Sequence, residues 1–168
     1  MLILTYNLIS IIVPSRQNTQ KMKNTKQKHV AVRFLTPEDV GPRPWGRETL
    51  LGLVPGLFSF KKLEIRAGNK GGVQYHHKKN ECGYLLSGML IIRFDTGDGK
   101  LQEKILNPGA CFHFPPGAVH QEEALTDCVI LEVSTPHFND RVRVEKKYGL
   151  PIAPGGLPST KRSEVVTR

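Results

Sequence analysis

Two neighbouring histidines followed by an acid make residues 68–88 the first stretch of the chain in which site chemistry is expected. His76 and His77 are adjacent, and Glu81 follows them. Adjacent side chains on a β-strand point to opposite faces, so two histidines in a row do not normally share one site. Gln74 lies two residues before His76, on the same face, and its amide oxygen can act as a ligand. The residues alone therefore leave open a Gln-x-His pair or a His-His pair.

The spacing of these residues resembles the two motifs of the cupin superfamily. Residues 68–88 are similar to the first motif, G-x5-H-x-H-x4-E-x6-G, with Gln74 in place of its first histidine. Residues 109–120 are similar to the second, G-x5-P-x-G-x2-H, although Ala124 stands where that motif usually ends in asparagine. Both motifs occur in the expected order, which is a much more specific signal than either alone.

The resemblance implies a metal site in which Gln74, His76, Glu81 and His120 are the ligands and His77 faces away. Nitrogen and oxygen ligands of this kind suit one divalent ion of Zn, Mn, Fe, Ni or Co. A structural alternative stays open, in which these groups are only hydrogen-bonded, as in cupins that have lost their metal.

A closer resemblance covers residues 42–149. The segments "PRPWG", "KKLEIRAG", "QYHHKKNE", "PPGAVH", "ILEVSTP" and "NDRVRVEKKYG" are similar to mannose-6-phosphate isomerase-like cupins. They also resemble the C-terminal cupin domain of bifunctional mannose-6-phosphate isomerase/GDP-mannose pyrophosphorylase. A Gln-x-His pair precedes the acid in that family, so Gln74 is expected there. The chain departs from the family at Lys78, Cys82, Gly83 and Asn139.

This second resemblance also implies roles for residues outside the metal site. Glu132 lies in the apolar segment "CVILEVS" and matches a family glutamate, so we expect it to act as the general base. A buried salt bridge to an arginine such as Arg143 is the alternative. Lys61 matches a family lysine and is expected to take part in catalysis. Lys79, Arg143 and Tyr148 are expected to bind the substrate.

The elements that must position these residues are short strands. Residues 58–68, 83–100, 101–120 and 127–136 read as strands separated by Gly and Pro turns, with no convincing helical period. Such a pattern favours an all-β antiparallel sandwich or barrel. The cupin resemblance makes the expected fold a single-domain double-stranded β-helix, a jelly-roll barrel.

Charge is distributed unevenly along the chain. The net charge is +9, but residues 1–28 carry five basic residues and no acid, and residues 151–168 carry three basic residues and one acid. The segment between them therefore holds 16 of the 24 basic and 14 of the 15 acidic residues. We expect a disordered basic leader over 1–28, a barrel over 29–150 and a loose Pro/Gly-rich tail over 151–168. Basic tails are usually solvated, so no nucleic-acid partner is expected.

The first fifteen residues are apolar but shorter than the about 20 residues that a membrane span needs. They also lack the positive start of a signal peptide, although a weak signal segment and an upstream start codon stay open as alternatives. The three cysteines, Cys82, Cys111 and Cys128, lie in apolar runs and form no zinc-binding pattern, so we expect buried free thiols. These features predict a cytoplasmic protein without a membrane partner.

Taken with the resemblance, the residues predict a metal-dependent isomerase that converts an aldose into a ketose and acts on a sugar or sugar phosphate. A homodimer is the expected assembly, because cupins commonly pair. Two alternatives stay open: a non-catalytic sugar-binding cupin and a metal-dependent oxygenase.

Overall fold

The computed structural model describes residues 30–152, 159, 161, 166 and 167, and the chain divides into two units, 1–33 and 34–168. In the first unit only residues 30–33 are described, and they are exposed and without regular structure. The predicted leader, 1–28, lies outside the described residues. The second unit contains the strands β1 (Glu38–Arg43), β2 (Gly46–Val54), β3 (Phe58–Ile65), β4 (Gln74–His76), β5 (Glu81–Ser87), β6 (Leu90–Asp95), β7 (Leu101–Leu106), β8 (Cys111–Phe114), β9 (His120–Ala124), β10 (Cys128–Ser134), β11 (His137–Phe138), β12 (Arg141–Arg143) and β13 (Val166–Thr167), and the short 3-10 helix η1 (Glu145–Tyr148).

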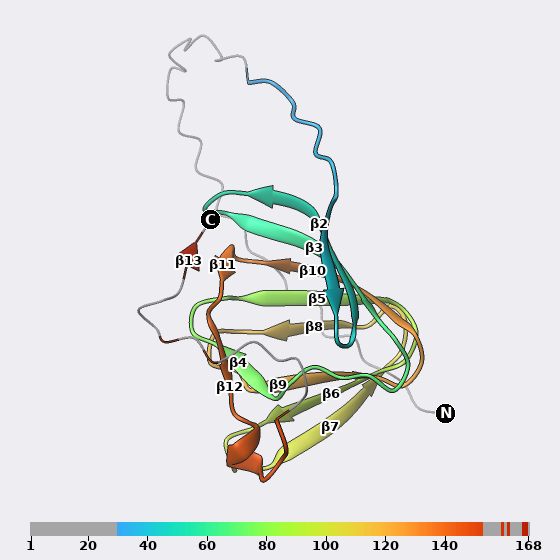
Figure 1. Ribbon diagram of the computed structural model, residues 1–168, viewed down its shortest axis with the longest axis vertical. Coiled ribbons are helices and arrows are strands. Elements are labelled where there is room, and N and C mark those ends of the chain that lie inside the picture. The colour runs from blue at the N-terminus through green and yellow to red at the C-terminus, as the bar shows by residue number, and fades with distance from the viewer. Residues whose placement is uncertain (1–29, 153–158, 160, 162–165, 168) are drawn as a thin grey trace, which may run out of the picture. The chain divides into compact units, whose positions relative to one another are not determined.

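Two antiparallel sheets form the body of this unit (Figure 1). Sheet A has the order β1-β2-β3-β10-β5-β8, and sheet B has the order β12-β4-β9-β6-β7. Strands that are distant in sequence therefore lie side by side, with β10 between β3 and β5 and β9 between β4 and β6. This arrangement confirms the predicted all-β jelly-roll fold of the double-stranded β-helix type.

The core follows from the period-2 pattern of the strands. Along β3, Leu63 and Ile65 are buried, whereas Lys62 and Glu64, which alternate with them, are more exposed. Strand β10 continues the same layer, since Ile130 pairs with Leu63 and is fully buried. The inner faces of both sheets supply the other members of this core cluster, Leu85, Leu90, Ile92, Leu106, Phe114, Ala124 and Cys128.

Gly88 shows why the predicted Ser-Gly break ends β5. Its φ is +86°, and a Cβ at this position would collide with the backbone oxygen of Asp127 and with Cys128. Only glycine therefore fits the turn into β6, which places the two halves of this apolar segment in different sheets.

Several short elements were not specified by the strand pattern. The β1–β2 hairpin extends sheet A beyond β3, and Trp45 in its turn packs against the core. Within the segment predicted as a loose tail, residues 166–167 form β13, which pairs with β11. No helix in the described part of the chain is long and apolar enough to cross a membrane.

The prediction that all three cysteines are buried was wrong for two of them. Cys128 is buried, but Cys82 and Cys111 are exposed. Strand parity explains the error, because Glu81 and Leu85 take the inward positions of β5 and leave Cys82 on the outer face. Cys111 pairs with Tyr84, which is also exposed on that face.

Candidate metal centre

Three of the four predicted ligands meet inside the barrel. His76 ends β4, Glu81 begins β5 and His120 begins β9. One ligand atom from each lies within 4.8 Å of the others, and all three residues are buried. The Nε2 atom of His76 is 3.4 Å, and that of His120 is 3.8 Å, from Oε2 of Glu81. His77 does not belong to this cluster.

The two imidazoles are held so that each presents the same ring nitrogen. His76 donates from Nδ1 to Asp140 Oδ1 at 2.6 Å, and His120 donates from Nδ1 to the carbonyl of Ala118 at 2.9 Å. Phe114 stacks on the His120 ring with centroids 4.0 Å apart. Carboxylate and carbonyl acceptors behind ligating histidines are typical of metal sites, because they fix the tautomer and the ring orientation.

The protonation states also suit a metal. Burial lowers the pKa of His120 and keeps its imidazole neutral, the form that binds a metal. Burial opposes the charged form of Glu81, but the ammonium of Lys79, the largest of the opposing influences, holds the pKa of Glu81 below its ordinary value. The donor set therefore fits a divalent ion.

Gln74, the fourth predicted ligand, lies in register with His120. The two residues are directly opposite one another on β4 and β9. Directly opposite residues of an antiparallel pair share one face of the sheet, so Gln74 is on the face that carries both histidines. Its role as a ligand stays a prediction.

Lys79 links the cluster to the predicted base. Its ammonium donates to Oε1 of Glu81 and, at 3.0 Å, to Oε1 of Glu132. Glu132 also accepts a 3.3 Å hydrogen bond from Ser134. Burial disfavours the ammonium, but the two carboxylates outweigh it and raise the pKa of Lys79. Lys79 therefore already has two carboxylate partners inside the barrel.

Glu122 is a further acidic residue of the site that the sequence reasoning missed. It lies two residues after His120 on β9, between the buried His120 and Ala124 on the same face, and its carboxyl group makes no hydrogen bond with any described residue. Burial, then the carboxylates of Glu132 and Glu81, raise the pKa of Glu122 to about 8. Strand parity after His120 was the signal that could have identified it.

In metal-free protein, we expect Glu122→Gln to be more stable than the wild type at neutral pH. When the pKa of a carboxyl group is raised in the folded state, the protein loses stability as the pH rises from the unfolded pKa of 4.5 towards the folded pKa of about 8. At pH 7 this raises the free energy of unfolding of Glu122→Gln above that of the wild type by roughly 3 kcal/mol, at 1.36 kcal/mol per pH unit. Thermal melting in the presence of a chelator at pH 4.5 and pH 7 measures it, with the neighbouring Glu123→Gln as control. Equal gains at both pH values would contradict the expectation.

The remaining predicted residues occupy separate positions. Lys61 lies opposite Glu132 on the inner face of sheet A, and its ammonium is 2.6 Å from Glu48. Arg143 lies opposite Gln74 and is paired with Glu145, not with Glu132 as the salt-bridge alternative expected. Tyr148, in η1, donates its hydroxyl to Asp95 at the end of β6.

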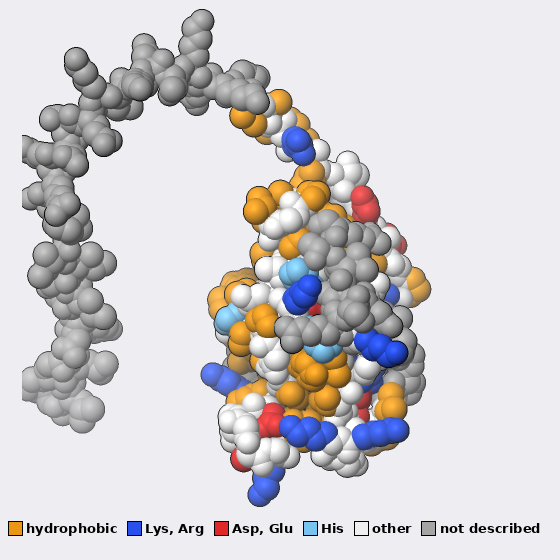
Figure 2. All heavy atoms as spheres, turned by 90° about the vertical axis from the view of Figure 1, so that its left-hand side faces the viewer, with side chains coloured by type: hydrophobic (Ala, Val, Ile, Leu, Met, Phe, Trp, Pro, Cys, Tyr) orange, Lys and Arg blue, Asp and Glu red, His pale blue; other side chains and the backbone are white. Residues whose placement is uncertain are grey.

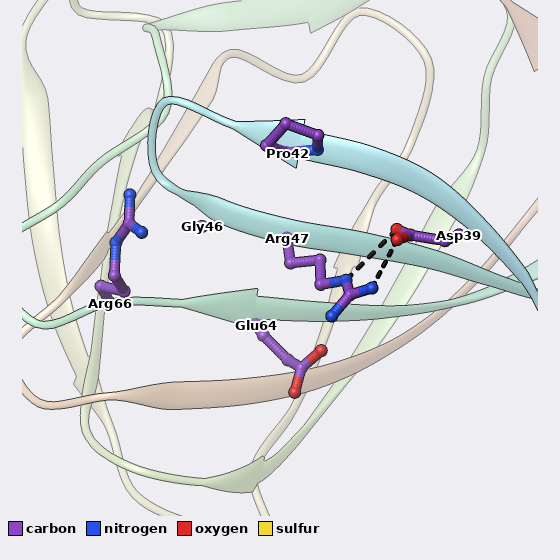
Figure 3. Close-up of a pocket in the computed structure, with 6 residues that line it drawn as sticks. All are labelled: Asp39, Pro42, Gly46, Arg47, Glu64 and Arg66. Atoms are coloured by element: carbon purple, nitrogen blue, oxygen red, sulfur yellow. Dashed lines mark hydrogen bonds and ion pairs between the residues drawn. The ribbon is translucent and has the colours of Figure 1, made fainter.

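Two hollows on the surface of sheet A lie apart from the cluster. The first, of about 490 Å³, is lined by residues of the β1–β3 region, and Figure 3 shows Arg47 in it reaching towards Asp39. The second, of about 640 Å³, is apolar and includes Cys82, Tyr84 and Val133 on its walls. Neither contains a predicted ligand. On the face seen in Figure 2, the Lys and Arg side chains are spread over the surface.

Comparison with known proteins agrees with the fold. Residues 62–134 match the protein-family model for the cupin domain, a range that includes His76, Glu81, Glu122, His120 and Glu132. The capsular polysaccharide assembling protein CapF from Staphylococcus aureus has a similar structure, with a TM-score of 0.53 and 23% identity, over 60% of this chain and 28% of that chain. At this identity the likeness shows the fold alone.

Two curated proteins are similar in sequence. Oxalate decarboxylase of Arthroderma benhamiae is 32% identical over 85 residues, which are 49% of this chain and 20% of that protein. Germin-like protein subfamily T member 3 of Arabidopsis thaliana is 28% identical over 110 residues, which are 64% of this chain and 48% of that protein. The chain thus spans less than half the length of each of these relatives.

Proposed function

We propose that this chain, with its cupin domain, is a metal-dependent sugar-phosphate isomerase of the mannose-6-phosphate isomerase-like kind. The observation that supports the proposal most directly is the convergence of His76, Glu81 and His120 beside two inward-facing carboxylates, Glu122 and Glu132. Isomerisation of an aldose to a ketose needs a proton carrier at carbon and a second one at oxygen. We assign these two roles to Glu132 and Glu122.

The four predicted ligands, Gln74, His76, Glu81 and His120, would hold the ion. A divalent metal bound there would supply Lewis-acid polarisation of the sugar carbonyl and of the neighbouring hydroxyl.

The two carboxyl groups would divide the proton transfers, one acting at the carbon atoms of the sugar and the other at its oxygen atoms. Glu132, an acceptor of the Lys79 and Ser134 hydrogen bonds, would take the proton from C2 of the sugar and return it to C1. Glu122 would supply a proton to O1 and recover one from O2. Each carboxyl then ends in the state in which it began, so that protons balance over the turnover.

The proposed function includes the partners of the protein and its location in the cell. We propose that the substrate is a small sugar or sugar phosphate, that no nucleic acid or membrane takes part, that the protein works as a homodimer and that it is cytoplasmic.

Turnover with a panel of sugar phosphates tests the proposed reaction. Metal-loaded protein in D2O is expected to convert mannose 6-phosphate into fructose 6-phosphate, followed by NMR, and to incorporate deuterium by exchange at the base. The His77→Ala variant should behave in the same way, because His77 is outside the ligand cluster. Binding of sugar phosphates without any turnover would overturn the proposal in favour of a sugar-binding cupin.

The likeness to oxalate decarboxylase favours a second candidate, a metal-dependent decarboxylase or oxygenase acting on a small carboxylate. With oxalate as substrate and in air, such an enzyme would release carbon dioxide or consume dissolved oxygen. An isomerase would do neither. Oxygen uptake and carbon dioxide release with oxalate, compared with sugar-phosphate turnover, distinguish the two reactions.

A further inference from the structure

Arg141, on β12, differs from the other basic residues of the barrel interior. Lys61, Lys79 and Arg143 are each paired with a carboxylate. Arg141 makes no ion pair with any described residue. Its Nε is the one buried side-chain nitrogen or oxygen in the described part of the chain that lacks a hydrogen-bond partner. A buried guanidinium nitrogen without a partner is costly, which makes this position unusual.

The position of Arg141 places it next to the metal ligands. It lies directly opposite His76 on the neighbouring strand, and Arg143 lies opposite Gln74. Opposite residues on an antiparallel pair have Cβ atoms about 4.5–5.5 Å apart and share a face of the sheet. A group bound to Arg141 would therefore lie beside the His76 side of the cluster.

The charges around Arg141 leave a positive excess. Arg43 and Lys61 share Glu48, while Arg143 is bound to Glu145. Together with Arg141, this group has four basic side chains against two carboxylates, an excess of two positive charges within the group. The neighbouring carboxylate of Asp140 is outside it and is bound by His76 and by the backbone amides of Lys78 and Lys79. Burial, then repulsion from Arg143 and Arg43, lowers the pKa of Arg141, so the folded protein holds this cation at a cost.

Arg143 is not free to move into the role of Arg141. Its guanidinium occupies the space that a side chain at residue 72 would fill, and this residue is Gly72. From there Arg143 donates to Glu145, which is buried. The packing thus commits Arg143 to Glu145 and leaves Arg141 as the guanidinium available to a ligand.

We propose that Arg141 is the anchor of an oxyanion subsite beside the metal centre, and that its occupant is a phosphate group. A guanidinium binds oxyanions through paired hydrogen bonds, and a phosphate dianion matches the excess of two positive charges. A carboxylate group has the same chemistry with half the charge. The identification of the phosphate as part of a sugar phosphate rests on the proposed function, whereas the oxyanion subsite does not.

The test measures binding of inorganic phosphate to the full chain by calorimetry, for the wild type and three variants. Arg141→Gln is expected to weaken binding at least tenfold, and Arg141→Lys, which keeps the charge, to weaken it less. Arg47→Gln is the matched control, because Arg47 is exposed and paired with Asp39 on the surface; it should bind phosphate as the wild type does. Without phosphate, Arg141→Gln should melt no lower than the wild type, since it removes a charged side chain whose buried Nε has no hydrogen-bond partner.

Three results would overturn the subsite. The first is equal phosphate binding by Arg141→Gln and the wild type, and the second is a marked loss of thermal stability in phosphate-free Arg141→Gln. The third is phosphate binding that a chelator abolishes in every variant, which would locate the phosphate on the metal. Acetate, tested in parallel, is expected to bind more weakly than phosphate, and tighter binding of acetate would overturn the assignment to phosphate. If phosphate binds but no sugar phosphate is isomerised, the subsite stands and the proposed function is refuted. If sugar phosphates are isomerised and Arg141→Gln binds phosphate as the wild type does, the proposed function stands and the subsite is refuted.

Discussion

Replacing His120 by alanine is expected to remove the metal and the activity together. Loss of a single outer contact of a metal-bound histidine typically lowers metal affinity 10–100-fold, so removal of a ligand should lower it by more than about 100-fold. The Nε2 of His120 faces Glu81, and its Nδ1 is engaged by the carbonyl of Ala118, so Nε2 is the ligand atom that this substitution removes. Metal content of the purified protein and turnover of mannose 6-phosphate are the two measurements.

His77→Ala is the matched control for this variant, because it removes a neighbouring imidazole that is not part of the cluster. It should retain both metal and turnover. His120 also stacks on Phe114, so His120→Ala leaves a cavity, and its melting temperature must be compared with that of Phe114→Leu. Full activity in metal-free His120→Ala would refute the metal-assisted mechanism.

Glu132→Gln is expected to lower kcat by roughly 10²–10⁴ while metal and fold are retained. Glutamine has nearly the same shape as glutamate and keeps an acceptor for Lys79 and Ser134, but it cannot take a proton from carbon. Steady-state kinetics together with metal analysis measure the effect. Glu64→Gln, on the outer face of sheet A, is the control and should leave kcat unchanged.

A purely structural role for Glu132 gives the opposite pattern. If the Lys79–Glu132 ion pair serves only to stabilise the barrel, Glu132→Gln and Lys79→Met should both melt earlier and keep their turnover per folded molecule. Wild-type turnover by folded Glu132→Gln would therefore exclude this residue as the base.

The strand pattern predicted the all-β class, and the resemblance to the two cupin motifs, combined with strand parity, predicted the jelly-roll fold and the convergence of His76, Glu81 and His120. The sequence could not predict which charged groups pair. Lys61 on β3 meets Glu48 on the adjacent strand β2, whereas Lys79, in the turn before β5, meets Glu132 on β10, which is distant in sequence. The second contact depends on the sheet order, which places β10 beside β5. A lysine near a proposed site therefore does not by itself indicate a substrate contact.

Glu122 and Arg141 were missed for different reasons. Glu122 could have been found from its parity with His120, since both lie on the inner face of β9. Arg141 could not, because its lack of a partner is visible only when the partners of Arg43, Lys61 and Arg143 are known. An unsatisfied group is a property of the whole fold.

The strand order also affects how this protein can fold during its synthesis on the ribosome. The strands β9 and β10 are synthesised late, yet they occupy interior places in sheets B and A. Until residues 120–134 have left the ribosome, β3, β5 and β6 each lack a neighbour along one edge, and β4 lacks a neighbour along both. Open edges invite pairing with other chains. A nascent chain stopped before residue 120 should therefore be sensitive to protease and should associate with chaperones, and protection should arise abruptly once β10 emerges.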